Sequence, residues 1–157
     1  DAKRQPQVHY DDRLLLSALI SKRPVPIEMA ENVPNGAAYD YTRRTVVVQR
    51  GMDGQDLFRC VSLAMARAEL DQTEHADPQS DAFRGYCVSY MLCRKYGVDA
   101  RGYDFSRLPE SLRDADSQTI RSELTDIRDT LQTMTSRMER ALEQSRAAAQ
   151  KNVRKER

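Results

Sequence analysis

The chain has 157 residues, a length that suits one domain with a single hydrophobic core. Its 25 Lys and Arg residues against 24 Asp and Glu residues give a net charge of +1, so the overall charge favours neither nucleic acid nor an acidic membrane. Any such binding must come from a local patch. No apolar run approaches the length of a membrane span and no signal-peptide pattern is present, so the sequence predicts no membrane partner.

The N-terminal part predicts a polar tail and then a helix. Residues 1–9 are polar and of mixed charge, which is typical of a linker or a disordered tail. Because the chain opens with Asp1 and not Met, we expect it to be a fragment of a longer protein. Apolar residues at helical spacing then indicate a helix that Asp11 can cap and that residues 21–26, SKRPVP, end. Its apolar side consists of Tyr10, Leu14, Leu15, Ala18 and Leu19.

The next segment predicts a strand and a hairpin. Apolar and polar residues alternate from Val25 to Met29, which indicates a short strand with one buried face, made of Val25, Ile27 and Met29. A turn at residues 34–36, PNG, precedes two segments with strand patterns, 37–41 and 45–50, which flank a three-residue turn as a hairpin. In the second strand, Val46 and Val48 should share one face and Val47 should lie on the other.

The hairpin has two interpretations. Its edge could accept a peptide as an added strand, by β-augmentation. The commoner alternative is an ordinary sheet edge, protected from pairing by the polar side chains of Arg43, Arg44 and Gln49.

Two adjacent helices form the predicted core. The first spans residues 57–70, and its apolar residues recur at helical spacing at Leu57, Phe58, Val61, Ala64, Met65 and Ala68. In the second, Asp77 can cap the start, Pro78 occupies the first helical position and Gly97 ends the helix in the left-handed conformation. Its expected buried side consists of Phe83, Tyr86, Cys87, Tyr90, Cys93 and Tyr96.

The second helix and the loop after it carry a family resemblance. Residues 83–106, FRGYCVSYMLCRKYGVDARGYDFS, resemble the segment FxAESVAYxVCxxYGLDTxxYSF of zincin-like metallopeptidase domains in mobile genetic elements, the antirestriction ArdC-type and LtrC-type proteins. Upstream, Ala68, Glu69 and Leu70 match the residues that follow the HExxH motif of this family. The likeness covers about residues 10–130. The matching positions are Phe83, Val88, Tyr90, Cys93, Tyr96, Gly97, Asp99, Tyr103 and Phe105.

The resemblance also implies that the catalytic centre has been lost. In the family, the two His of HExxH and a Glu of the next helix bind zinc, while the Glu of HExxH is the general base. Here the metal positions hold Leu63, Arg67 and Tyr86, and the general-base position holds Ala64. Leu and Ala offer no lone pair, Arg stays protonated, and a neutral Tyr is a poor zinc ligand. We therefore expect no metal, no cofactor and no catalytic residue.

No other catalytic or metal site emerges from the remaining residues. The soft metal ligands are few, and no Cys-x-x-Cys or His-x-x-x-His spacing joins them: His9, His75, Cys60, Cys87 and Cys93. The three cysteines are expected to be small buried hydrophobes in the reducing cytoplasm rather than a disulfide framework. The glycines are scattered as turn and cap residues, so no phosphate-binding loop is predicted.

A long helix is predicted near the C-terminus. Asp116 or Ser117 can cap it, and we expect it to run unbroken to at least Arg140. Its apolar residues recur at alternating steps of four and three, at Ile120, Leu124, Ile127, Leu131, Met134, Met138 and Ala141. We expect the domain to cover the first three of them. Leu131, Met134 and Met138 either dock on the same chain or form a seam that pairs with another helix, in a homodimer or with another partner.

The last stretch is basic, with Arg146, Lys151, Arg154, Lys155 and Arg157 against a single acid, Glu156. Such residues can bind nucleic acid through its phosphates, weakly and without sequence preference. The commoner explanation is that they complement the helix dipole and keep the end of the chain soluble. Aromatic residues for base stacking are absent from this stretch.

Together these patterns predict an α+β fold, with a small sheet packed on a two-helix core and a long C-terminal helix. The expected divisions are a polar tail at 1–9, a degenerate zincin-like domain at 10–113, a long amphipathic helix at 114–150 and a basic tail at 151–157. The expected function is that of a catalytically inactive, metal-free module that binds a protein or peptide partner in a mobile-element protein. The alternative is a hydrolase that uses an unrecognised metal or catalytic site.

Overall fold

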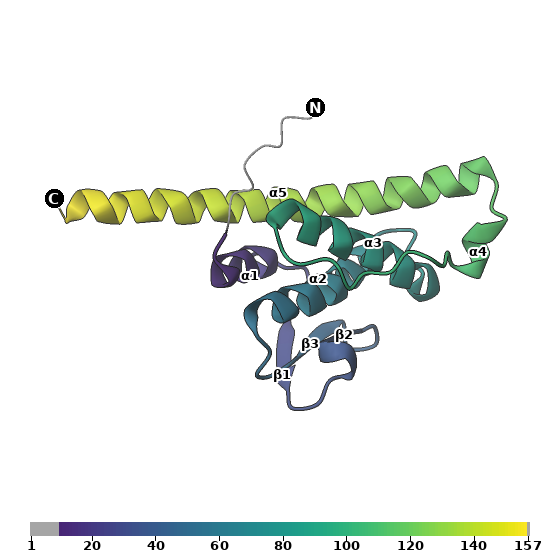
Figure 1. The fold of residues 1–157 in the computed structure, drawn as a ribbon, viewed down its shortest axis with the longest axis horizontal. Coiled ribbons are helices and arrows are strands. Elements are labelled where there is room, and N and C mark those ends of the chain that lie inside the picture. The colour runs from purple at the N-terminus through teal and green to yellow at the C-terminus, as the bar shows by residue number, and fades with distance from the viewer. Residues whose placement is uncertain (1–9, 157) are drawn as a thin grey trace.

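The computed structural model describes residues 10–156, and the predicted tail at 1–9 lies outside them. The fold is mixed α+β, with a small sheet, a pair of packed helices and a long C-terminal helix (Figure 1). The first half contains α1 (Asp12–Ile20), β1 (Ile27–Ala30), the 3-10 turn η1 (Pro34–Gly36), β2 (Ala37–Asp40) and β3 (Thr45–Gln49). The second half contains α2 (Gly54–Asp71), α3 (Pro78–Tyr96), α4 (Glu110–Arg113) and α5 (Ser117–Lys155).

The sheet has the order β1-β3-β2, with β1 parallel and β2 antiparallel to β3. The predicted hairpin is confirmed, because Tyr39 of β2 pairs with Val46 of β3. Val46 and Val48 are buried on the face that packs on α2, whereas Val47 is only half-buried. The hairpin's second strand is therefore the central strand of the sheet, and β1 and β2 form the two edges of this sheet.

The prediction of one buried face for β1 is wrong in part. Val25 is buried before the strand begins, but Met29 is 49% exposed. The cause lies in what covers the sheet, since α2 packs mainly on β2 and β3 and leaves the outer strand β1 with little cover. Alternation of residue types predicted the strand correctly, but not the absence of a helix above it.

The two core helices begin and end largely as the sequence predicts. The Asp77 side chain accepts a hydrogen bond from the Gln79 amide at 3.2 Å, Pro78 follows it, and Gly97 ends α3 with φ +73°. The predicted face of α2 is buried except for Leu57, which is half-buried. On α3 the prediction fails for three aromatic side chains, Phe83, Tyr86 and Tyr90, which are half-buried. Smaller residues face α2 instead, among them Gly85 and Ser89, because two helices approach closely where side chains are small.

The long helix is confirmed as one unbroken element of 39 residues, capped by Asp116, whose side chain accepts from the Thr119 amide at 2.7 Å. Helical structure continues through the stretch predicted as a basic tail, as far as Lys155. Figure 1 shows α5 lying along one side of the molecule, with α2 and α3 between it and the sheet. Its C-terminal part extends past α1 and away from the domain. We call residues 143–155 the projecting end.

The prediction that the domain covers Ile120, Leu124 and Ile127 is confirmed for Ile127, which is 4% exposed, and wrong for the other two. Ile120 and Leu124 are 42% and 59% exposed, whereas Met134 and Met138 are each 1% exposed. The domain covers the middle of α5, where α1, α2 and α3 pack against it, rather than its first turns. Met134 and Met138 are thus buried within one chain, with Leu131 half-buried beside them, so this seam is not free to pair with a second helix.

Candidate functional site

The positions that the resemblance assigns to the metal, Leu63 and Arg67, lie where α2 and α3 pack closely together. Leu63 and Arg67 stand one turn apart on α2, and Gly85 of α3 packs directly against them. A Cβ atom on Gly85 would lie 3.1 Å from Arg67 Cγ and 3.6 Å from the Leu63 carbonyl oxygen. Direct packing therefore occupies the interface between this turn of α2 and α3.

Tyr86 follows Gly85, and its ring contacts the loop after α3. Its centroid lies 5.0 Å from that of Tyr103 and 5.1 Å from that of Phe105, and its hydroxyl accepts a hydrogen bond from the Asp104 amide at 2.6 Å. Tyr90, one turn further along α3, packs on the same two rings. A direct meeting of the Tyr86 side chain with Leu63 and Arg67 stays a prediction.

Ala64, which the resemblance assigns to the general-base position, faces the protein interior. Ala64 is 2% exposed and belongs to the main hydrophobic core, together with Val61 and Met65. A general base must lie within hydrogen-bond reach of the proton that it removes, directly or through one water. A side chain at this position would be directed into packed apolar residues. Neither Ala64 nor its neighbours at 63 and 67 offer a group that binds zinc, so the residues present do not fit a zincin metal centre.

A buried ion-pair cluster, which the sequence did not reveal, joins α3 to α5. The Arg84 guanidinium donates two hydrogen bonds to Glu123, one of them 2.9 Å long, and lies 3.5 Å from Asp126. On its own helix it lies 3.4 Å from Asp81, which is fully buried. Only the spacing of Asp81 and Arg84, three residues apart on one helix, could have suggested this cluster.

Burial strongly affects the carboxyl of Asp81. It raises the Asp81 pKa from 3.8 to about 6, although the positive charge of Arg84 acts in the opposite direction. One carboxylate oxygen, Oδ2, has no hydrogen-bond partner within residues 10–156. A buried polar atom without a partner costs free energy, so Asp81 is a source of local instability.

Two more buried polar atoms without partners in the described chain occur in this region, the Tyr41 hydroxyl and Arg67 Nε. Burial raises the pKa of Tyr41, the negative charge of Asp81 adds to the effect, and the positive charge of Arg67 opposes it. Tyr41 follows β2, Arg67 lies on α2 and Asp81 on α3, so three elements bring polar groups together. Arg67 is only half-buried and reaches solvent in part, as an arginine without a buried partner must.

A network of hydroxyl groups fixes the loop after α3. Ser62 and Ser89 lie 2.6 Å apart between α2 and α3, and the Tyr103 hydroxyl lies 2.6 Å from Ser89. Cys93 Sγ is 3.6 Å from the same Tyr103 oxygen. Ser62 and Ser89 are fully buried, so neither can attack a substrate as a nucleophile. The network instead holds Tyr103 in place beneath Tyr86.

Within the described residues, the cysteines and His75 offer no metal site. All three cysteines are free, and burial raises the pKa of Cys87 to about 11, which disfavours the thiolate form that binds metals. His75 is exposed in the α2–α3 link, as expected, while His9 lies outside the described residues. Within residues 10–156, no group of three or more His, Cys, Asp or Glu side chains is placed to hold a metal ion.

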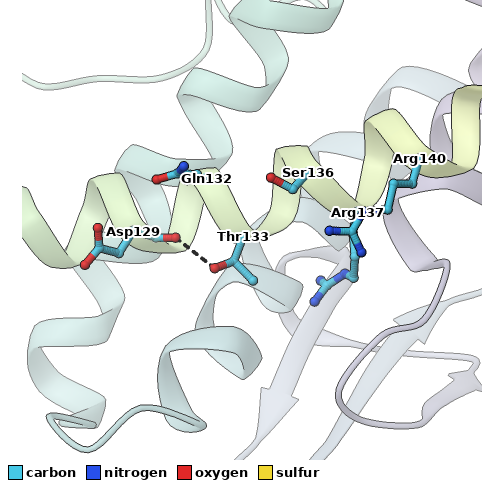
Figure 2. A pocket seen from close by; sticks show the side chains of 6 residues that line it. All are labelled: Asp129, Gln132, Thr133, Ser136, Arg137 and Arg140. Atoms are coloured by element: carbon cyan, nitrogen blue, oxygen red, sulfur yellow. Dashed lines mark hydrogen bonds between the residues drawn. The ribbon is translucent and has the colours of Figure 1, made fainter.

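A polar hollow of about 460 Å³ lies along the middle of α5 (Figure 2). The six side chains that line it all come from this one helix: Asp129, Gln132, Thr133, Ser136, Arg137 and Arg140. Thr133 bonds to the Asp129 carbonyl oxygen at 3.0 Å, and Arg137 turns towards α2, where it donates to Glu69 at 2.9 Å. A hollow with walls from a single helix cannot enclose a small molecule as ligand pockets do.

Over residues 10–156, no helix has both the length and the apolar character needed to cross a membrane. Comparisons of the chain with protein-family models, with curated proteins and with solved structures gave no match.

Proposed function

We propose that this chain is a catalytically inactive, metal-free domain of the zincin-like metallopeptidase type, which acts as a protein-binding module in a mobile-element protein. The observation that carries the proposal is which residues occupy the turn at 63–67 and how they are buried. Its metal positions hold Leu63 and Arg67, and its general-base position holds Ala64, buried in the core. The packing of Gly85 against this turn supports the alignment behind the resemblance. Tyr86, which holds the position of the third ligand, is the next residue on α3.

The partner in this proposal is a peptide that adds a strand to the sheet at β2. The other edge strand, β1, carries a charged pair that discourages strand addition, since Glu28 accepts hydrogen bonds from Arg43 at 2.6 Å. On β2, Ala37 and Ala38 have small uncharged side chains, and Ala38 is exposed. Main-chain hydrogen bonds supply the affinity in such a complex, so no catalytic group is needed.

Restoring the lost ligands tests the proposal. The triple variant L63H/R67H/Y86E should bind one zinc ion per chain, because it returns two His one turn apart and a Glu on the next helix. The matched control L63H/R67H/Y90E places the same Glu one turn further along α3. We expect isothermal titration calorimetry to show zinc affinity at least about 100-fold weaker for the control, since it has only two properly placed ligands.

The unchanged chain provides the second half of the test. As purified it should contain no stoichiometric zinc, and a chelator should leave its melting temperature unchanged, because a structural zinc contributes several kcal/mol to folding. Elemental analysis showing one zinc per wild-type chain would overturn the proposal. Equal zinc affinity of the triple variant and its control would overturn the register on which the zincin-like assignment rests.

A further inference from the structure

The projecting end of α5 is exposed along its whole length. Every residue from Glu143 to Glu156 is exposed, whereas Leu142 just before it is buried. At 1.5 Å per residue, its 13 residues extend about 20 Å. Figure 1 shows this part of α5 beyond α1, with no other element beside it. No tertiary packing in the described chain supports these turns, and an isolated helix of this length is only marginally stable in water.

Charge is distributed unevenly between this end and the rest of the chain. From residue 143 to the end, the sequence contains five Lys and Arg residues against two Glu, while residues 1–142 contain 20 Lys and Arg against 22 Asp and Glu. The net charge of +1 therefore conceals a basic end with a charge of +3 and a remainder with a charge of −2. A local positive field of this kind attracts polyanions even when the whole chain is nearly neutral.

The cations of the projecting end form no ion pair in the described chain, although Arg154 and Lys155 in the last turn complement the helix dipole. Over the part of the chain that the structure describes, none of the exposed Arg146, Lys151, Arg154 and Lys155 side chains forms an ion pair. In the middle of the same helix Arg137 is directed inward to Glu69. The projecting cations are therefore available to a partner without loss of any contact within the domain.

Helical spacing puts most of these cations on one face. Lys151, Arg154 and Lys155 are separated by three and four residues, so they are neighbours on the helix surface. Arg140 precedes Lys151 by 11 residues, which is close to three full turns, and extends the same face. From Arg140 to Lys155 this face is about 22 Å long. Glu143 and Ala147 lie between them on this face, so it carries one acid beside Arg140 and a small residue one turn before Lys151.

The side chains that are absent from this sequence segment narrow the choice of polyanion. Residues 143–156 contain no Phe, Tyr, Trp or His, so they offer no platform on which the bases of a single strand could stack. Val153 is the one bulky apolar residue among them, which is too little for a helix to insert into a lipid surface. The phosphate backbone of a duplex needs neither feature.

We propose that the projecting end of α5 binds the phosphate backbone of double-stranded nucleic acid without reading its base sequence. Four to five cations neutralise a similar number of phosphates and release their counterions. The affinity is modest, with a dissociation constant on the order of 10⁻⁴ to 10⁻⁶ M at physiological salt, and it rises as salt falls. This interaction is independent of the proposed peptide site at β2, which lies on another part of the domain.

The test uses fluorescence anisotropy of the full chain with labelled 20-base-pair duplexes of two unrelated sequences. Both should bind with the same affinity within about threefold, and the logarithm of the binding constant should fall with the logarithm of salt concentration with a slope of about −4. The variant R146Q/K151Q/R154Q/K155Q should bind at least about 10-fold more weakly at low salt. Circular dichroism should show an unchanged helix, because Gln and Arg have similar helix propensities.

A control with the same loss of charge makes the result specific. The variant R94Q/K95Q/R121Q/R128Q removes four exposed cations from α3 and the first half of α5 and should leave duplex binding within about twofold. Equal weakening by both variants would overturn the proposal, since it would locate the effect in overall charge. Equal or tighter binding of a single-stranded 20-mer or of phosphatidylserine vesicles, or no salt dependence, would overturn it as well.

Discussion

The middle of α5 and its projecting end belong to one continuous helix, yet they relate to the rest of the chain in opposite ways. In the middle, Met134 and Met138 are buried against the domain and Arg137 pairs with Glu69. At the end, Val153 is 56% exposed and the cations pair with nothing in the described chain. Backbone geometry is the same in both regions. The difference shows that helix formation and helix docking are separate properties, and that the second depends on what lies opposite.

The largest effect is expected where α5 is tied to α3 by Arg84. Replacing Arg84 by Met leaves Asp81 buried without its cation and removes the partner of Glu123 and Asp126. Breaking a buried ion pair from one side costs about 3–5 kcal/mol. We expect a loss of that size in the free energy of unfolding, measured by urea denaturation.

The control for this prediction is Arg128→Met, on α5. Arg128 is exposed and pairs only with its neighbour Asp129 at 3.4 Å, so its loss should change stability by less than about 0.5 kcal/mol. If the Arg84 variant were no less stable than the Arg128 variant, the cluster would contribute nothing to the docking of α5.

The second prediction compares the two regions directly. Met134→Ala should reduce the free energy of unfolding by about 2–5 kcal/mol, because it opens a cavity in the core. Val153→Ala in the projecting end should change it by less than about 0.5 kcal/mol, since no packing is lost and Ala is a better helix former. Thermal unfolding of both variants in parallel measures the contrast. Similar losses would mean that something covers the projecting end.

The third prediction concerns Asp81 and depends on pH. Its pKa is about 6 in the folded chain against 3.8 ordinarily, so the ionised form destabilises the fold by up to about 3 kcal/mol. Asp81→Asn removes that charge and should raise the melting temperature at pH 7. As pH falls through 6 towards 4, the wild-type carboxyl takes up its proton and regains stability, so the advantage of Asn should vanish. An advantage that persists below pH 4 would contradict a titrating Asp81.

Local sequence signals predicted the elements well but not their surroundings. The cap at Asp77 and the left-handed Gly97 fixed the ends of α3, because these signals act within a few residues. Which turns of α5 are covered could not be derived in this way. Ile120 and Met134 are both apolar and belong to the same heptad pattern. Met134 is buried because α1, α2 and α3 pack against the middle of α5, and this packing cannot be read from the pattern.

The candidate site shows the same limit. The resemblance placed Leu63 and Arg67 on one turn of α2, which follows from helical spacing alone. The contact of that turn with Gly85, and the burial of Asp81 beside Arg84, arise between residues far apart in the chain. A buried Asp is also uncommon, so residue type predicted the opposite environment for Asp81.

The length of α5 has a consequence for how the molecule moves through solution. At 39 residues the helix is about 58 Å long. This length is nearly four times the radius of gyration of about 15 Å that a compact chain of 157 residues would have. An elongated particle experiences more friction than a sphere of equal mass, so on a sizing column a single chain should elute ahead of its 18.0 kDa mass. A monomer could thus pass for a dimer by elution alone, and light scattering is the measurement that separates shape from mass.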